Sequence, residues 1–260
     1  MFAGVDIGSV TAKAVIIDEG QEILAFSLMP SASDRHQSGA DVLNLATGKT
    51  GASRHDLKYI VSTGYGRRSF TWSNKALPEI VCHAKGTKFL FPSARTIIDI
   101  GGQDSKVIEL DEDGNVSKFE MNDKCAAGTG RFLEVLTERI LNIPMEEVGP
   151  LSLKCKTPCS LSSICTVFAE SEIISYLSEN RPKEDIVCGM NRAIAKRVVH
   201  MGSAGLIGYK EPVVFSGGVA KNIGVVKAIE EQLQRRMHIP EEPQITAALG
   251  AALFASESLK

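Results

Sequence analysis

The stretch "VDIGSVTAKAVIID", Val5–Asp18, recurs later in the chain as "IDIGGQDSKVIEL", Ile98–Leu110. In each copy an apolar run ends in Asp-Ile-Gly, and a lysine follows the aspartate by seven positions. Apolar, β-branched runs on both sides of a glycine-containing polar turn predict two strands joined by a tight turn. Two such units in one chain indicate a duplicated architecture.

Similar elements are expected around each copy of this repeat. Around the first we predict strands at 22–28 and 58–62 and helices at 40–49 and 78–91. Around the second we predict strands near 95, 105 and 116, a cysteine-containing turn, and helices at 131–141 and 181–202. Strands followed by helices, twice over, predict an α/β protein of two similar lobes with a cleft between them. We expect the first lobe at 1–92, the second at 93–243, and a closing helix at 244–260 that packs back on the first.

The composition excludes several classes of protein. The 260 residues carry 29 basic and 31 acidic side chains, so the chain lacks the basic surplus typical of nucleic-acid binding. The longest weakly polar stretch, "ITAALGAALFA", has 11 residues, whereas a membrane-spanning helix needs about 20. An acid, Asp6, stands where a secretion signal has a basic segment and an apolar core. We therefore expect a cytoplasmic protein that binds neither nucleic acid nor membrane.

Each repeat places an acid and a glycine at the end of a strand. Such a turn suits phosphate, because glycine lets backbone amides approach it and the carboxylate can hold Mg²⁺ through water. One such turn alone is more often a simple hairpin. Two matched copies, with a third glycine turn in "FSGGVAKN", Phe215–Asn222, favour nucleotide binding. The Walker and dinucleotide-binding glycine patterns are both absent.

These three turns resemble the nucleotide-binding pattern of the actin, sugar kinase and Hsp70 superfamily, whose two lobes clamp ATP. "GVDIGSVTAK" resembles the phosphate 1 motif, "IIDIGGQDSK" the phosphate 2 motif and "VVFSGGVAKN" the adenosine motif. "ALGAALFA" resembles the second connecting helix of that superfamily. The resemblance implies a two-lobed, ribonuclease H-like α/β fold and a site for ATP or ADP with Mg²⁺.

Residue roles follow from this resemblance. Asp6 and Asp99 are candidates for the water-mediated Mg²⁺ shell, and Gln103 and Asp104 for orienting the hydrolytic water. The candidate nucleotide-binding residues are Gly8, Ser9, Thr11, Lys13, Gly101, Gly102, Gly217, Gly218, Lys221 and Asn222. For Lys13 and Lys106 the alternative is a solvated position on a strand.

Two cysteines stand in front of predicted helices, Cys125 in "NDKCAAGTGRFLE" and Cys165 in "SSICTVFAESEIISYL". At a helix N-terminus the free amides and the helix dipole stabilise a thiolate or a negatively charged thiolate-bound cluster. Iron or zinc is the natural partner of such thiolates. A four-thiolate site needs two more ligands, and a symmetric dimer with its axis through the site would supply them.

The two cysteine motifs, together with "VDIGS", "DIGGQDSK" and "SGGVAKN", resemble those of the ATP-dependent activators of 2-hydroxyacyl-CoA dehydratases. These activators fall in the BadF/BadG/BcrA/BcrD-type ATPase family, and the resemblance runs from about residue 3 to 255. It implies that Cys125 and Cys165 of each of two subunits hold one [4Fe–4S] cluster at the interface of a homodimer. It further implies an oxygen-sensitive ATPase that passes single electrons to a dehydratase or reductase component, with reduced ferredoxin or flavodoxin as the donor.

The remaining cysteines leave alternatives open. Cys155 and Cys159 precede Cys165 in a C-x₃-C-x₅-C run, which could bind a metal by itself or consist of reduced loop thiols. Cys82 and Cys188 fall in predicted helices, where we expect them in the core, as small buried cysteines often are. His83 has no second ligand at helical spacing and is expected to be structural.

The function also has rivals. The electron acceptor could be benzoyl-CoA reductase or another low-potential cluster protein. A small-molecule kinase of the same fold would need a general base in place of the cluster, and a non-catalytic assembly module would use its cysteines for structural zinc.

Overall fold

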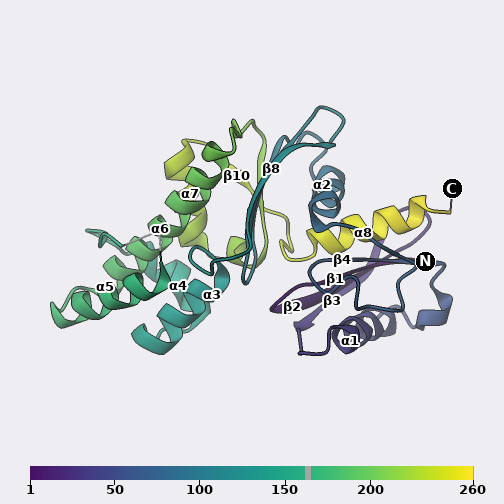
Figure 1. Ribbon diagram of the computed structural model, residues 1–260, viewed down its shortest axis with the longest axis horizontal. Helices are drawn as coiled ribbons and strands as arrows, with labels where there is room; N and C mark the ends of the chain where they lie inside the picture. The colour runs from purple at the N-terminus through teal and green to yellow at the C-terminus, as the bar shows by residue number, and fades with distance from the viewer. Residues whose placement is uncertain (162–164, 260) are drawn as a thin grey trace. The chain divides into compact units, whose positions relative to one another are not determined.

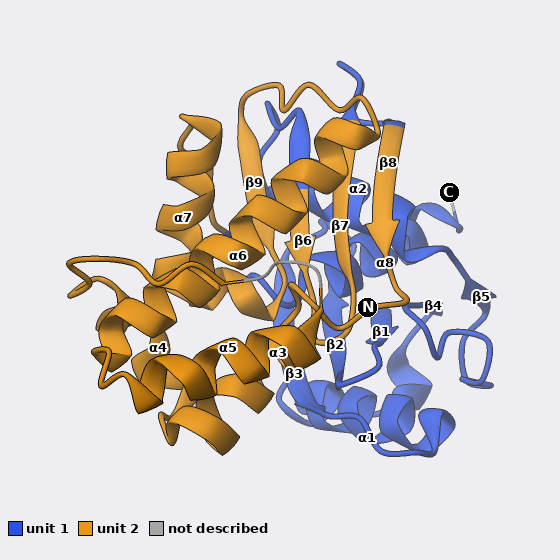
Figure 2. Ribbon diagram, turned by 60° about the vertical axis from the view of Figure 1, so that its left-hand side comes forward, with its two compact units in different colours: residues 1–97, 110–117, 240–260 blue, residues 98–109, 118–239 orange. Residues whose placement is uncertain are grey.

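The computed structural model describes residues 1–161 and 165–259, which form two compact units (Figure 1, Figure 2). Unit 1 comprises residues 1–97, 110–117 and 240–260, and unit 2 comprises residues 98–109 and 118–239. In the described residues, each unit is built on a five-stranded sheet.

Unit 1 holds the first copy of the repeat. Its sheet has the order β3-β2-β1-β4-β5, with β1 (Phe2–Ile7), β2 (Thr11–Ile17), β3 (Ile23–Pro30), β4 (Tyr59–Thr63) and β5 (Lys75–Ala76). Its helices are α1 (Arg35–Gly48), the 3-10 turn η1 (Arg54–Asp56), α2 (Glu79–Leu90) and α8 (Thr246–Glu257). Strand β1 pairs antiparallel with β2 and parallel with β4, so it lies in the centre of the sheet.

Both faces of this sheet are covered, and every residue of β1 is therefore buried. Ala3, Val5 and Ile7 pack with α1 on one face, while α8 covers the other face and α2 packs on α8. At Gly4 a side chain would collide with the carbonyl oxygen of Ala248, because the backbone of α8 lies directly against the strand.

Unit 2 holds the second copy of the repeat. Its sheet has the order β10-β9-β6-β7-β8, with β6 (Thr96–Ile100), β7 (Ser105–Leu110), β8 (Val116–Asn122), β9 (Val213–Ser216) and β10 (Met237–His238). Its helices are α3 (Gly130–Glu134), which continues as a π-helix η2 (Val135–Leu141), then α4 (Met145–Ser152), α5 (Thr166–Ser178), α6 (Lys183–Ala204), the 3-10 turn η3 (Gly218–Lys221) and α7 (Ile223–Leu233). The core of this unit joins the sheet to α6 and α7, with Ile98, Phe215, Met190 and Ile229 all fully buried.

The predicted duplication is confirmed in its essentials: each copy of the repeat forms two neighbouring strands, β1 with β2 and β6 with β7. The helix predicted at 40–49 begins earlier, at Arg35, because Asp34 caps its N-terminus and accepts a hydrogen bond from the amide of Gln37. In the described part of the chain, no helix is both long enough and apolar enough to cross a bilayer.

Candidate functional site

The turn of the first repeat, which is predicted to bind phosphate and is called the first phosphate turn below, joins β1 to β2 in unit 1. Asp6 lies opposite Lys13 in the strand register, and the Lys13 ammonium is 3.1 Å from the Asp6 carboxylate. The amide of Gly8 donates to the carbonyl of Thr11 at 3.0 Å, which closes the turn. A Cβ at Gly8 would lie 2.9 Å from that carbonyl oxygen, so the turn requires glycine. The solvated alternative for Lys13 is wrong, because the buried carboxylate of Asp6 needs its countercharge.

Arg35, at the start of α1, holds the outside of this turn. Its guanidinium donates to the carbonyl oxygens of Gly8 and Ser9, each at 3.3 Å, and the Ser31 hydroxyl donates to the Gly8 carbonyl at 3.0 Å. These contacts fix the orientation of two consecutive peptide planes. The sequence analysis missed Arg35, since it lies 27 positions after the turn and no motif connects the two.

Gly64, at the end of β4, lies against the Asp6 carboxylate. It has a φ of +82°, and a side chain there would collide with the carboxylate oxygen. The sequence signal was a second glycine-rich stretch, "STGYGR", directly after the predicted strand at 58–62. Unit 1 therefore surrounds Asp6 with two backbone turns and one lysine.

The second phosphate turn, in unit 2, has the same backbone closure and more charges. The Lys106 ammonium lies 3.3 Å from the Asp99 carboxylate and 2.8 Å from the Asp104 carboxylate. The Ser216 hydroxyl of β9 donates to the other oxygen of Asp99 at 2.8 Å. Lys106 is 2 % exposed, so the solvated alternative is wrong here too.

The segment that carries Cys125 is attached to this second turn. The amides of Gly130 and Arg131, at the start of α3, donate to the carbonyls of Gly101 and Gly102 at 2.9 and 2.8 Å. Helix α3 therefore begins on the phosphate turn. Gln103, by contrast, is exposed on the turn.

The structure corrects the prediction that both thiols lie at helix N-termini. Cys165 is the N-cap residue of α5, as predicted. Cys125 lies five positions before α3, whose N-cap is Thr129, and the first amides of that helix are bound to the phosphate turn. Cys125 belongs instead to a compact turn: its carbonyl accepts from the Asn122 amide at 2.7 Å, and the Thr129 hydroxyl donates to the Ala126 carbonyl at 2.6 Å.

Cys125 and Cys165 are both half-buried free thiols. The first turn of α5, directly after Cys165, exposes Val167 and Phe168 by 65 % and 62 %. Exposed apolar side chains beside a half-buried thiol are more typical of an interaction surface than of a helix face that is in contact with water. Residues 162–164 of the second cysteine motif lie outside the described residues.

The adenosine turn follows β9. Gly217 has a φ of +86°, and a side chain there would collide with the carbonyl of Ile100, so this turn lies against the end of β6 beside the second phosphate turn. Asn222 is buried and caps α7, accepting from the amides of Gly224 and Val225 at 2.9 and 3.3 Å. The side-chain oxygen of Asn222 is therefore bonded to the amides of the helix, whereas Lys221 is exposed.

The remaining cysteines divide differently from the prediction. Cys82 is buried in α2, as expected, and burial raises the pKa of its thiol to about 12. His83 is also buried. Cys188 lies in α6 as predicted, but it is only half-buried and lies beside Cys155, so the prediction of a core position is wrong.

The described cysteines of the C-x₃-C-x₅-C run are not arranged as a metal site. Across residues 1–161 and 165–259, no group of three or more His, Cys, Asp or Glu side chains is placed so that it could hold a metal ion. Cys155 contacts Cys188 and Asp185, whereas the pKa of the buried Cys159 thiol is raised by its burial and the thiol hydrogen-bonds to Arg181.

The class of protein follows from the fold. A ROK family glucokinase from Streptomyces griseus, solved with glucose and AMPPNP, superposes with a TM-score of 0.59 over 98 % of this chain and 99 % of its own, at 14 % identity. The predicted fold class, an α/β fold like that of the actin, sugar kinase and Hsp70 proteins, is confirmed.

The family is narrower than this superfamily. The chain belongs to the BadF/BadG/BcrA/BcrD ATPase family, whose model matches residues 3–255. It is 46 % identical to a 2-hydroxyisocaproyl-CoA dehydratase activator from Clostridioides difficile over 257 residues, 99 % of this chain and 95 % of the relative. The solved structure of an activator of the 2-hydroxyisocaproyl-CoA dehydratase from Clostridium difficile, with bound ADPNP, covers 99 % of this chain and 95 % of its own, with a TM-score of 0.93 and 46 % identity. The predicted family and the assignment as an ATPase are confirmed.

Proposed function

We propose that this protein is a cytoplasmic, homodimeric iron–sulfur ATPase that activates a 2-hydroxyacyl-CoA dehydratase by one-electron reduction. Reduced ferredoxin or flavodoxin would supply the electron, and ATP hydrolysis would drive its transfer. One observation carries the proposal: the segment of Cys125 starts its helix on the carbonyls of Gly101 and Gly102, within the second phosphate turn. The similarity to dehydratase activators, one of them solved with an ATP analogue, supports the assignment of the partner.

The proposed nucleotide site consists of the backbone amides of the glycine turns and of two acids that are each paired with a lysine. Asp6 and Asp99 would hold Mg²⁺ through water, and each already has a lysine within salt-bridge distance. The lysine is the countercharge of each carboxylate and can turn toward phosphate oxygens when the nucleotide binds. The glycines of the three turns leave room for phosphate beside the backbone.

Gln103 is our candidate for orienting the hydrolytic water. It is exposed on the turn, whereas the neighbouring Asp104 is held by Lys106. Gln103→Ala therefore removes the amide without disturbing the ion pairs and should slow ATP hydrolysis with little change in stability. An unchanged hydrolysis rate would remove Gln103 from the mechanism and leave the rest of the proposal standing.

The cysteine end fits a thiolate-bound cluster by its donor chemistry. Cys125 and Cys165 are half-buried, and neither is in a disulfide. Cys165 caps α5, where the helix dipole favours negative charge. A [4Fe–4S] cluster supplies one-electron chemistry at low potential, and it takes four thiolates, so two chains would each contribute two.

ATP hydrolysis would be coupled to the cluster through the two hydrogen bonds that join the second phosphate turn to the start of α3. When the phosphate turn adjusts to the loss of the γ-phosphate, the amides of Gly130 and Arg131 must follow Gly101 and Gly102 or lose two hydrogen bonds. Each such bond contributes about 1 kcal/mol, so movement of α3 and the Cys125 turn is the less costly response. Changes in hydrogen bonding and solvent exposure are what set the potential of an iron–sulfur site.

The first test is an anaerobic purification with counts of iron, sulfide and zinc per dimer. We expect about four iron per dimer, lost in Cys125→Ser and in Cys165→Ser and kept in the matched control Cys155→Ser. Zinc in place of iron would favour the assembly module, and iron that survives both substitutions would refute the assigned ligands.

The second test separates the acceptors. Reduced protein with ATP should activate a purified 2-hydroxyacyl-CoA dehydratase component, and ADP should not support this reaction. Activation of a benzoyl-CoA reductase component alone would move the protein to the second acceptor. Phosphorylation of an added metabolite without electron transfer would favour the kinase.

A further inference from the structure

The loop that follows α4 is fastened to the first turns of α6. The carboxylate of Asp185 accepts hydrogen bonds from the amides of Lys156 and Thr157 at 2.9 and 3.1 Å. The backbone carbonyl of Asp185 accepts a further hydrogen bond from the amide of Cys159 at 3.0 Å. At Gly189 a side chain would collide with the carbonyl of Cys159. Residues 155–159 of the loop therefore have a fixed position on the helix, although they form no helix or strand.

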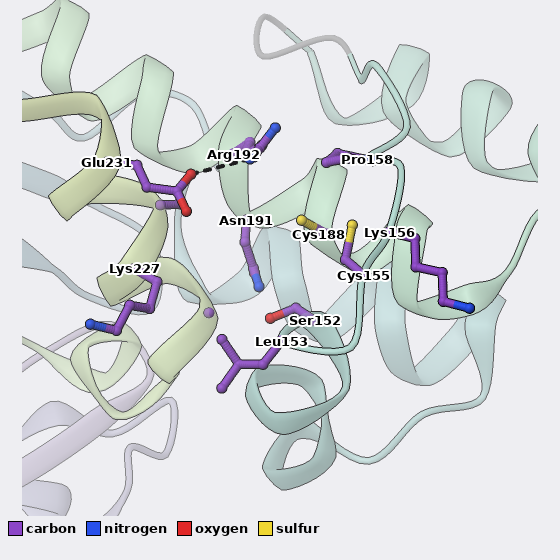
Figure 3. Close-up of a pocket in the computed structure, with 12 residues that line it drawn as sticks. Ser152, Leu153, Cys155, Lys156, Pro158, Cys188, Asn191, Arg192, Lys227 and Glu231 are labelled. Carbon is purple, nitrogen blue, oxygen red and sulfur yellow. Dashed lines mark hydrogen bonds and ion pairs between the residues drawn. The ribbon is translucent and has the colours of Figure 1, made fainter.

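This attachment brings two thiols together. Cys188 follows Asp185 by three positions and shares its face of α6. The thiol of Cys155 is hydrogen-bonded to Cys188 and to Asp185. Figure 3 shows the two sulfur atoms next to each other at the wall of a pocket of about 220 Å³, which is also lined by Ser152 and Asn191. Both thiols are half-buried, so a small molecule that enters the pocket can reach them.

We propose that Cys155 and Cys188 form a redox-active dithiol, at which a hydroperoxide oxidises the two thiols to an intrachain disulfide between the loop and α6. The proposal does not depend on the iron–sulfur site, because neither cysteine is one of the candidate cluster ligands.

The reaction balances with the peroxide as the sole oxidant. The first sulfur attacks one peroxide oxygen, so that an S–O bond forms, the O–O bond breaks and one water leaves. The second thiol then attacks the sulfenic sulfur, so that the S–S bond forms, the S–O bond breaks and a second water leaves. The two thiols lose two electrons and two protons, and hydrogen peroxide is reduced to two waters.

The surroundings assign the two roles. Burial, with the hydrogen bonds to Cys188 and Asp185, raises the pKa of the Cys155 thiol to about 12. The Cys155 thiol donates to the Asp185 carboxylate, and this hydrogen bond holds the proton on the Cys155 sulfur. Cys188 therefore attacks the peroxide, and Cys155 resolves the sulfenic acid.

Peptide mapping tests this proposal directly, because trypsin separates the thiols. Cleavage after Lys154 and Lys156 releases residues 155–156, and cleavage after Lys183 and Arg192 releases residues 184–192. Reduced full-length protein is treated with a small excess of hydrogen peroxide, blocked with N-ethylmaleimide under denaturing conditions, and digested without reductant.

We expect the dipeptide 155–156 linked to the peptide 184–192, two fewer maleimide labels per chain, and recovery of both labels after dithiothreitol. Recovery of both peptides with free, labelled thiols would overturn the proposal. Linkage of 184–192 to 157–183, which contains Cys159 and Cys165, would overturn the assignment of the partner.

Variants test the order of events. Cys155→Ser should leave a sulfenic acid on Cys188 that dimedone traps, whereas Cys188→Ser should leave Cys155 unmodified at the same dose. The matched control Cys159→Ser, in the same loop, should keep the disulfide. The double variant Cys125→Ser/Cys165→Ser should give the same linked peptides, whatever its iron content; absence of the link there and in the native chain would refute the dithiol.

Discussion

The two copies of the repeat form the same turn in different surroundings. In unit 1, Asp6 has a single lysine partner, Lys13, whose side chain is 13 % exposed. In unit 2, the side chain of Lys106 is 3 % exposed and pairs with two carboxylates, those of Asp99 and Asp104. One sequence pattern has thus produced a simple ion pair in one unit and a buried charge network in the other.

The attachments of the two turns differ as well. Side chains of unit 1, Arg35 and Ser31, hold the carbonyls of the first turn. The carbonyls of the second turn, at Gly101 and Gly102, hold the first amides of α3. The first turn, the proposed phosphate site of unit 1, is thus held in place by side chains of its own unit. The second turn is hydrogen-bonded to the start of α3, so that a movement of this turn would also move the segment that carries Cys125.

The largest expected effect is on the second turn. Lys106→Met leaves the buried carboxylate of Asp99 and the partly exposed carboxylate of Asp104 without their shared cation. Removing one partner of a buried ion pair costs about 3–5 kcal/mol, so we expect a loss of that size in the free energy of unfolding. Urea unfolding measures it, with Lys118→Met, an exposed strand lysine of the same unit, as the control. Equal losses in the two variants would contradict the buried network.

The same substitution in the first turn should cost less. Lys13→Met leaves only one carboxylate, that of Asp6, without its cation, and Lys13 itself is partly exposed. We expect a loss of about 2 kcal/mol, the range of a single charged hydrogen bond. The measurement is the same unfolding experiment, run in parallel with Lys106→Met. If Lys13→Met proved the more damaging of the two, the ranking of the two turns would have to be reversed.

The third prediction concerns Arg35, which holds the first phosphate turn in place. Arg35→Lys keeps the charge but cannot donate to the carbonyls of Gly8 and Ser9 in the same planar geometry. We expect the KM for ATP to rise roughly tenfold, since about 1.4 kcal/mol of positioning is lost, with little change in stability. Arg54→Lys, which alters an arginine stacked on Trp72 in the same unit, is the matched control. A KM unchanged by Arg35→Lys would show that the turn holds its shape without the guanidinium.

Much of the fold could be predicted from the repeat, because local pattern decides where strands and glycine turns form. Asp6 and Asp99 were found because each ends an apolar run at the same distance from a lysine. The helix at 131–141 was found as well, but its π-helical continuation was not, since a change of hydrogen-bond register leaves no trace in apolar periodicity.

The rest of the site depends on contacts between residues far apart in the chain. Arg35 and Ser216 reach their turns from other elements, and no spacing rule connects them to Gly8 or Asp99. The pairing of Cys155 with Cys188 was likewise missed, because the loop is placed on α6 by backbone bonds to Asp185. Periodicity alone had assigned Cys188 to the core.

The smallest expected effect comes from a position where the two copies differ in chemistry. Glu109 of β7 corresponds in the repeat to Ile16 of β2, which is fully buried. The hydrogen bond from Lys210, at 2.9 Å, holds the pKa of the Glu109 carboxyl below its usual range, and the amide of Gly208 adds to this. Because the pKa is lower in the folded state, this stabilisation is present at neutral pH and is lost as the pH falls through the folded pKa.

Glu109→Gln should therefore be less stable than the native chain at pH 7 by less than about 1 kcal/mol, since Lys210 is half-exposed. The difference should shrink when the free energy of unfolding is measured at successively lower pH, below the usual pKa of a glutamate, about 4.3. Glu112→Gln, at a fully solvated position of unit 1, should show no such convergence. If the difference in the free energy of unfolding between Glu109→Gln and the native chain stayed constant with pH, the buried carboxyl would contribute through packing and not through its charge. The side chains at this position of the two copies would then differ in shape but not in electrostatic contribution.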